Sequence, residues 1–137
     1  MKETIEFNLK ERLIDFAVRI IKLSEALPNT RAGQHICGQV LRSGTAAASN
    51  YGEAQGAESR ADFIHKVKIA LKELRETEVW LKIIVKSGIV IPATKLDPLL
   101  KETDELISIL FTSVSTAKKN IQHSTRNIQR SSLENLE

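Results

Sequence analysis

Apolar residues recur at helical spacing in four segments of the 137-residue chain. Intervals of three and four residues place side chains on one face of an α-helix, so each segment predicts an amphipathic helix. The predicted core lines are Leu9, Leu13, Phe16, Ile20, Leu23 and Leu27; Ile36, Val40, Ala47, Tyr51 and Ala54; Phe63, Val67, Ala70, Leu74, Leu81 and Val85; and Leu99, Leu106, Leu110, Val114 and Ala117.

Residues that start or stop helices separate these segments. Pro28 ends the first, Ser59 is a candidate N-cap of the third, and Gly88 stops it. The fourth begins at Thr94 or at Asp97-Pro98, with Asp97 as its N-cap and Pro98 as its first helical residue. Short connections favour antiparallel neighbours, so we predict an all-α, antiparallel up-down-up-down four-helix bundle over residues 1–119. The polar residues that follow carry no sustained stripe, and they predict a flexible C-terminal tail over residues 120–137.

Two of the predicted helices carry a second apolar stripe. It consists of Ile14, Val18 and Ile21 on the first helix, and of Ile69, Trp80 and Ile83 on the third. A monomeric bundle needs one stripe per helix, so the second predicts a further packing surface that a neighbouring subunit covers, Trp80 included. The alternative is that these are single exposed apolar residues, which are common on protein surfaces.

The second predicted helix is nearly all small residues from 44 to 52, which permits close approach of its neighbours. Arg42 and Glu53 share a face away from its core line, eleven residues apart, so each needs a partner elsewhere. On the third helix, Glu78 projects near the core line and Glu76 near the second stripe. A buried acid needs a charged or hydrogen-bonding partner. We therefore predict that Arg42 pairs with Glu76 or Glu78, within the chain or across a subunit contact.

Charge and cysteine content limit the cellular compartment and the kinds of partner that we expect. The single Cys37 excludes an intrachain disulfide framework and fits a reducing compartment. With no secretory signal or membrane-length apolar run in view, we expect a cytoplasmic protein without a membrane partner. The net charge is +3, but residues 1–117 carry 16 basic against 15 acidic residues. A nearly neutral body gives little support for nucleic-acid binding.

Known catalytic and metal-binding patterns are missing from the sequence. A di-iron bundle needs two Glu-x-x-His pairs and two further Glu, and the closest approach here is a single Asp62-x-x-His65. Cys37 and His35 are poorly spaced for contact on a helix, and no Gly-rich phosphate loop is present. We expect no catalytic residue, no cofactor and no metal, and hence a non-enzymatic protein.

Basic residues gather on the third predicted helix, interleaved with acids. One interpretation is a solvated face with ion pairs along the helix. The other is a phosphate-contacting strip, repeated around an oligomer. The candidate nucleic-acid contacts are Arg60, Lys66, Lys68, Lys72, Arg75 and Lys82. The bases after residue 117 are a second, weaker candidate.

Residues 39–53, QVLRSGTAAASNYGE, are followed by Asp62-Phe-Ile and by Glu76-x-Glu78. In this order they resemble the small four helix bundle protein family, over residues 13–118. That family includes proteins encoded in intervening sequences of large-subunit ribosomal RNA genes and the accessory protein of diversity-generating retroelements. The resemblance implies ring-like homopentamers and, from the retroelement relative, binding of a reverse transcriptase and RNA through a basic surface. The chain departs from the pattern at Ala48, where the family usually has Pro, and in the single Arg60 of the following turn.

Pattern and resemblance together predict a homo-oligomeric, ring-forming bundle, most simply a pentamer, that acts as a scaffold or accessory module. Its possible partners are RNA, DNA or a reverse transcriptase. The alternative is a structural protein–protein ring with no nucleic-acid role. The residues expected at interfaces or as buried polar groups are Arg42, Asn50, Glu53, Glu76, Glu78, Trp80, Ile83, Ile14, Val18 and Ile21.

Overall fold

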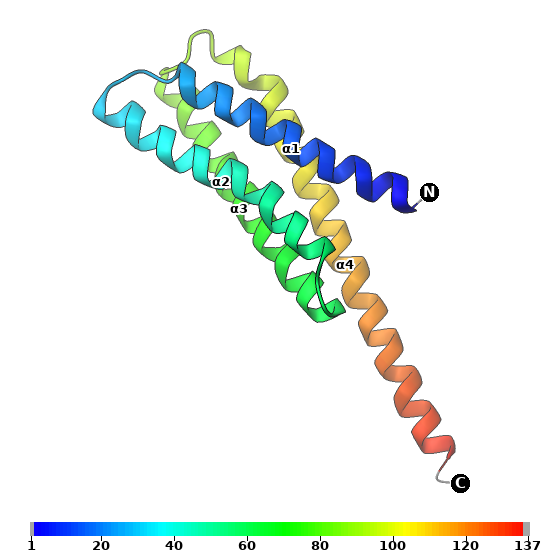
Figure 1. Cartoon of the computed structure of the whole chain (residues 1–137). Coiled ribbons are helices and arrows are strands. Elements are labelled where there is room, and N and C mark those ends of the chain that lie inside the picture. The colour runs from blue at the N-terminus through cyan, green and yellow to red at the C-terminus, as the bar shows by residue number, and fades with distance from the viewer. Residues whose placement is uncertain (1, 136–137) are drawn as a thin grey trace.

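The computed structural model describes residues 2–135, with side chains from Leu9 onward, and it is helical almost throughout (Figure 1). No strand occurs within these residues, which confirms the all-α, four-helix prediction. The elements are α1 (Lys2–Ala26), α2 (Arg31–Gln55), α3 (Arg60–Ser87), the short 3₁₀ helix η1 (Ala93–Leu96) and α4 (Asp97–Glu134).

Consecutive helices pack side by side: α1 on α2, α2 on α3 and α3 on α4. The α1–α2 and α3–α4 connections lie at one end of the molecule, and the α2–α3 connection lies at the other (Figure 1). An ion-pair cluster joins α1 to α4. Arg12 donates to Glu102 and, over 2.9 Å, to Glu105. The hydrogen bonds to Glu102 raise the pKa of Arg12 above its ordinary value.

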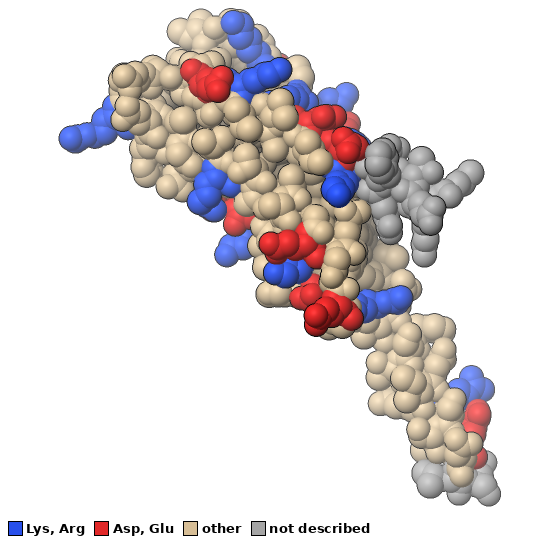
Figure 2. All heavy atoms as spheres, viewed as in Figure 1, with Lys and Arg blue, Asp and Glu red and all other residues tan. Residues whose placement is uncertain are grey.

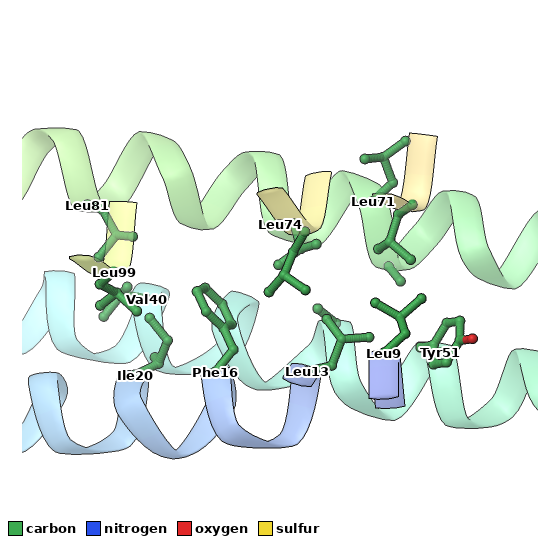
Figure 3. Close-up of a cluster of buried hydrophobic side chains, with 14 of the residues drawn as sticks. Leu9, Leu13, Phe16, Ile20, Val40, Tyr51, Leu71, Leu74, Leu81 and Leu99 are labelled. Atoms are coloured by element: carbon green, nitrogen blue, oxygen red, sulfur yellow. The ribbon is translucent and has the colours of Figure 1, made fainter. Parts of the chain in front are cut away.

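The core is aliphatic, with Phe16 as its one fully buried aromatic side chain among the described residues. Figure 3 shows Leu13 and Phe16 of α1 and Leu74 of α3 pointing into the same interior. Every predicted core position on α1, α2 and α4 is buried, so these three lines are confirmed.

The predicted core line of α3 is wrong at its ends. Phe63 and Val85 are only partly buried, whereas Ile64 and Ile84, one position inward, are buried together with Leu71. α3 packs between α2 and α4, so its buried face is wider than one stripe. α2 also packs between two helices, but small residues occupy the added width of its face, whereas on α3 large apolar side chains occupy it.

Local signals set the helix ends. Ser59 caps α3 as predicted, and its side chain accepts a hydrogen bond from the Asp62 backbone N–H over 3.0 Å. Gly88 ends α3 with φ of 70°, a left-handed conformation that glycine adopts at little cost. η1 leads into α4, so both predicted starting points mark helical structure. Asp97 is the first residue of α4 rather than its cap.

The small residues of α2 bring its neighbours close. A Cβ atom added at Gly44 would lie 2.7 Å from Cγ1 and Cγ2 of Ile20, so α1 packs directly on the α2 backbone there. On the other side, the buried hydroxyl of Thr77 in α3 donates to Ser43 Oγ of α2 over 2.9 Å. Both contacts need short side chains, which is what the sequence supplies.

The C-terminal segment differs from its prediction. We expected a flexible tail from residue 120, but α4 continues as one helix through Glu134 and projects beyond the bundle (Figure 1). No Gly or Pro follows Pro98, so nothing in the backbone stops the helix. The predicted boundary does mark a change in packing, because Ile121 is the only partly buried residue from Lys118 to Asn135. Residues 136 and 137 of the predicted tail lie outside the described residues.

Candidate interaction surfaces

Aliphatic side chains form two exposed strips on the outside of the bundle. The α1 strip consists of Ile14, Val18 and Ile21, each about 40% exposed and spaced by four and three residues. The α3 strip consists of Val79, which is 55% exposed, and Ile83. The α3 strip lines a shallow apolar hollow with the stems of its flanking lysines. The structure thus leaves the predicted second stripes uncovered on α1 and on part of α3.

Trp80 was predicted to lie outside the core, where another subunit would cover it. In the structure, α2 of the same chain covers it in part. The His35 and Trp80 rings meet edge to face, with centroids 5.9 Å apart. The indole Nε1 donates to Glu76 Oε2 over 3.4 Å. Trp80 therefore belongs to the α2–α3 contact and is not part of the α3 strip.

Arg42 bridges α2 and α3. It donates to Glu73 Oε2 over 3.1 Å and to Glu76, so the predicted pairing with Glu76 is confirmed and lies within the chain. The alternative partner, Glu78, instead pairs with Lys82 one turn later on α3, at 3.5 Å. Half of the Arg42 side chain remains exposed to solvent. The network stabilises a helix contact and leaves no buried charge uncompensated.

The other predicted polar residues are satisfied locally. Asn50 Nδ2 donates to the Ala46 carbonyl over 2.8 Å, within its own helix. Glu53 accepts a hydrogen bond from Lys66 Nζ over 3.0 Å, across the α2–α3 contact. That bond raises the pKa of Lys66. The structure therefore does not bring Arg42, Asn50 and Glu53 together in one site.

The predicted nucleic-acid contacts divide into two groups. Lys66 and Lys82 are ion-paired to Glu53 and Glu78, so their charges are already balanced. Arg60 is exposed at the first turn of α3. Figure 2 shows both signs of charge interspersed over the face in view.

The remaining candidates line a groove between α3 and α4, here called the α3–α4 groove. Its residues are Lys68, Leu71, Lys72, Arg75, Phe111, Val114 and Lys118. The sequence alone did not identify Phe111 as a member of a site, and it placed Lys118 only in the weaker candidate formed by the bases after residue 117. Phe111 is an aromatic residue off the core line of α4, and this was the one available signal. The groove itself depends on how two distant segments pack.

The ammonium groups of Lys68 and Lys118 meet at one end of this groove. The close approach of Lys68 and the charge repulsion between the two ammonium groups lower the pKa of Lys118 below its ordinary value. None of the described residues that line the groove is acidic. It is therefore a local concentration of positive charge on a body that is otherwise nearly neutral.

Catalytic and metal-binding groups do not converge in the described residues. Within them, no cluster of three or more His, Cys, Asp or Glu could hold a metal ion. Cys37 is partly buried, and its Sγ donates to the Ser24 carbonyl over 3.5 Å. None of the described helices is long and apolar enough to cross a membrane.

Comparison with known proteins finds a matching family model and a similar solved structure. A family model described as 23S rRNA-intervening sequence protein matches residues 6–112. A crystal structure of a protein of unknown function from Bacteroides thetaiotaomicron, assigned to the S23 ribosomal protein family, is similar with a TM-score of 0.72 and 36% identity. The similarity covers 77% of this chain and 97% of that one. No curated protein matches the chain.

Proposed function

The chain belongs to the 23S rRNA-intervening sequence protein family, and from that premise we propose that it is a non-catalytic interaction module that self-associates. One observation carries the proposal: the bundle leaves two aliphatic strips exposed on different helices. Contiguous exposed apolar surface on a folded protein commonly marks an interaction site. The predicted polar residues of α2 and α3 already have partners within the chain, whereas the aliphatic side chains of the two strips remain exposed.

The positions of the strips favour a head-to-tail contact. Both lie on helix sides that point away from the core, and α1 and α3 do not pack against each other. The strips therefore lie on two helices that do not contact each other. A contact between the α1 strip of one copy and the α3 strip of the next uses two different patches, and such contacts generate closed rings when the rotation fits. A homopentamer, which the family resemblance implies, would be one such ring.

Self-association is a better-supported role than nucleic-acid binding. A phosphate-binding track needs a run of available bases. Here Arg42, Lys66 and Lys82 are held by acids of the same chain. Of the predicted contacts, Lys68, Lys72 and Arg75 are the ones that gather in one hollow, the α3–α4 groove.

The mass of the full chain in solution tests the proposal. We expect light scattering after size exclusion to give a multiple of 15.3 kDa, fivefold for the pentamer. Two double variants, Val18→Ser with Ile21→Ser and Val79→Ser with Ile83→Ser, should both lower the mass. Ile91→Ser, at an isoleucine that is 80% exposed outside both strips, is the matched control and should not lower it.

Mixing the two double variants separates a head-to-tail contact from a symmetric one. Each variant retains the strip that the other lacks, so a head-to-tail contact predicts a one-to-one heterodimer and no larger species. A monomeric wild-type protein at every soluble concentration would contradict self-association. Dimers formed by either variant alone would contradict the head-to-tail arrangement.

A further inference from the structure

The α3–α4 groove has an apolar floor and basic rims. Leu71 and Val114 are buried at its base, and Phe111 stands on the α4 side with 56% of its surface exposed. Lys68, Lys72 and Arg75 line the α3 side, and Lys118 closes one end. The groove encloses about 370 Å³, which is room for several side chains and too little for a folded domain.

No acidic side chain of the described residues lines the groove to offset its positive charge. The close approach of two of its four bases, Lys68 and Lys118, lowers the pKa of Lys118. Bringing two like charges together is unfavourable unless a negative group joins them. The groove therefore complements an acidic ligand.

The spacing of the bases matches a helix. Lys68, Lys72 and Arg75 follow one another by four and three residues, so they rise by about 6 Å and about 4.5 Å along α3. An acidic residue every three or four positions on a second helix has the same repeat. The furrow between two packed helices is also the surface into which a third helix fits its side chains.

We propose that the α3–α4 groove binds an acidic amphipathic helix of a partner protein. Aliphatic side chains of that helix contact Leu71, Phe111 and Val114, and its carboxylates pair with the four bases. The arrangement is a helix in a hydrophobic groove, with affinity from the apolar floor and orientation from the charged rims.

Two other occupants fit less well. The projecting end of α4 from a second copy carries four bases and one acid over residues 118–134, so it would be repelled. A nucleic-acid strand needs a longer basic track, and on α3 the flanking Lys66 and Lys82 are already paired with acids. Charge complementarity and the limited length of the groove both favour a short acidic segment.

This inference stands apart from self-association. None of the residues that line the groove belongs to the α1 strip or the α3 strip. The groove proposal can therefore fail while self-association holds, and the reverse is also true. The mass of each groove variant in solution shows whether self-association is intact while peptide binding is measured.

Fluorescence anisotropy with the full chain tests the groove. The probe is a labelled synthetic helical peptide with a leucine stripe flanked by glutamates at four- and three-residue spacing. We expect saturable binding at low salt that weakens steeply as salt rises. The double variant Lys72→Glu with Arg75→Glu should weaken binding by about tenfold or more, and Phe111→Ser by about fivefold. The charge-matched control, Lys22→Glu with Lys101→Glu, changes exposed lysines outside the groove and should stay within about twofold.

Three results would overturn the proposal. The first is no saturable binding of the acidic peptide by the wild-type protein. The second is binding that does not depend on complementary charge at the groove. It would appear as equal binding of a peptide in which every glutamate is replaced by lysine, or as an equal loss of binding in the control variant. The third is displacement of the peptide by a single-stranded RNA of mixed sequence that binds more tightly, which would assign the groove to nucleic acid. Circular dichroism and unchanged mass establish that each variant is folded and assembled as the wild type.

Discussion

The bundle contains two kinds of helix contact: those of α2 with α1 and α3, and the one between α3 and α4. Both rest on the same periodic pattern of apolar residues, but only the contacts of α2 are closed to solvent. Around α2 the helices close on one another: Ile20 packs on Gly44, and Thr77 bonds to Ser43 in the buried interior. Between α3 and α4 the floor is buried, yet Phe111 and four basic side chains remain outside it. The contacts of α2 therefore form part of the buried core, whereas the contact between α3 and α4 leaves a groove at the surface.

Side-chain size explains this difference better than hydrophobic pattern. Small residues allow two backbones to approach until no space is left between them, whereas long charged side chains keep their ends in water and hold the rim open. A stripe of apolar residues occurs on every helix here. The residues that flank the stripe decide whether the surface is sealed or available to a partner.

Filling the closed contact should produce the largest effect. Gly44→Ala places a methyl group 2.7 Å from two carbons of Ile20, close to the branch point of that side chain. We expect a loss of about 1–3 kcal/mol in the free energy of unfolding. Gly52→Ala is the matched control, because its Cβ would meet no atom within 4 Å and better helix propensity should add up to about 1 kcal/mol. Equal effects in urea denaturation would show that α1 and α2 are not in close contact.

Removing the buried hydroxyl contact should have the next largest effect. Thr77→Val keeps the shape of the side chain but deletes the contact of its hydroxyl with Ser43 as well as the contact with the Glu73 carbonyl of its own helix, so we expect a loss of about 1 kcal/mol. Thr103→Val deletes a buried hydroxyl that bonds only the Leu99 carbonyl of its own helix, at 2.7 Å. Chemical denaturation of both variants checks the comparison. A larger loss in Thr103→Val would mean that the hydroxyl pair does not join α2 to α3.

The half-exposed ion pairs of Arg42 should contribute less. Arg42→Ala removes pairs with Glu73 and Glu76 at the edge of the α2–α3 contact, and we expect a loss of about 0.5–1 kcal/mol that shrinks at high salt. A double-mutant cycle with Glu76→Ala measures the coupling. If the cycle shows no coupling and the melting temperature is unchanged, the pair of Arg42 with Glu76 does not stabilise the protein.

The smallest effect belongs to the open groove. Since Lys118 has a lowered pKa in the folded protein, its charged form is disfavoured there. The resulting penalty acts in full below the lowered pKa and is relieved as pH rises from there to the ordinary pKa of lysine. Lys68→Gln should therefore raise the pKa of Lys118 and slightly increase stability at neutral pH. Lysine side-chain NMR titration measures this shift. Lys72→Gln, which does not contact Lys118 in this way, should leave it where it is.

How far the sequence predicts the core depends on which side chains occupy the width of each buried face. The core lines of α1, α2 and α4 follow from one stripe each, and small residues fill the rest of the α2 face between α1 and α3. On α3, large apolar side chains fill that width, so the buried positions at its ends are Ile64 and Ile84 rather than Phe63 and Val85. The pair of Arg42 with Glu76 was predictable, because a charge near an apolar face needs a partner.

The groove and the end of α4 were not predictable for different reasons. The groove joins residues 68–75 to residues 111–118, and no local pattern shows that these segments meet. For residues 120–134, polar composition predicts exposure correctly but does not determine the backbone. A helix continues through exposed residues when no breaker stops it, as it does here up to Glu134.

The continuity of α4 has a mechanical consequence. From Lys118 to Glu134 the helix extends about 25 Å past the packed body, at 1.5 Å per residue, without a hinge. A flexible chain of the same length would let an attached object turn freely. A helix instead fixes both the direction and the rotational angle of whatever is joined to it. In a symmetric assembly, the projecting ends of α4 would lie at equal angular intervals, and the bundle that anchors each end would set its direction.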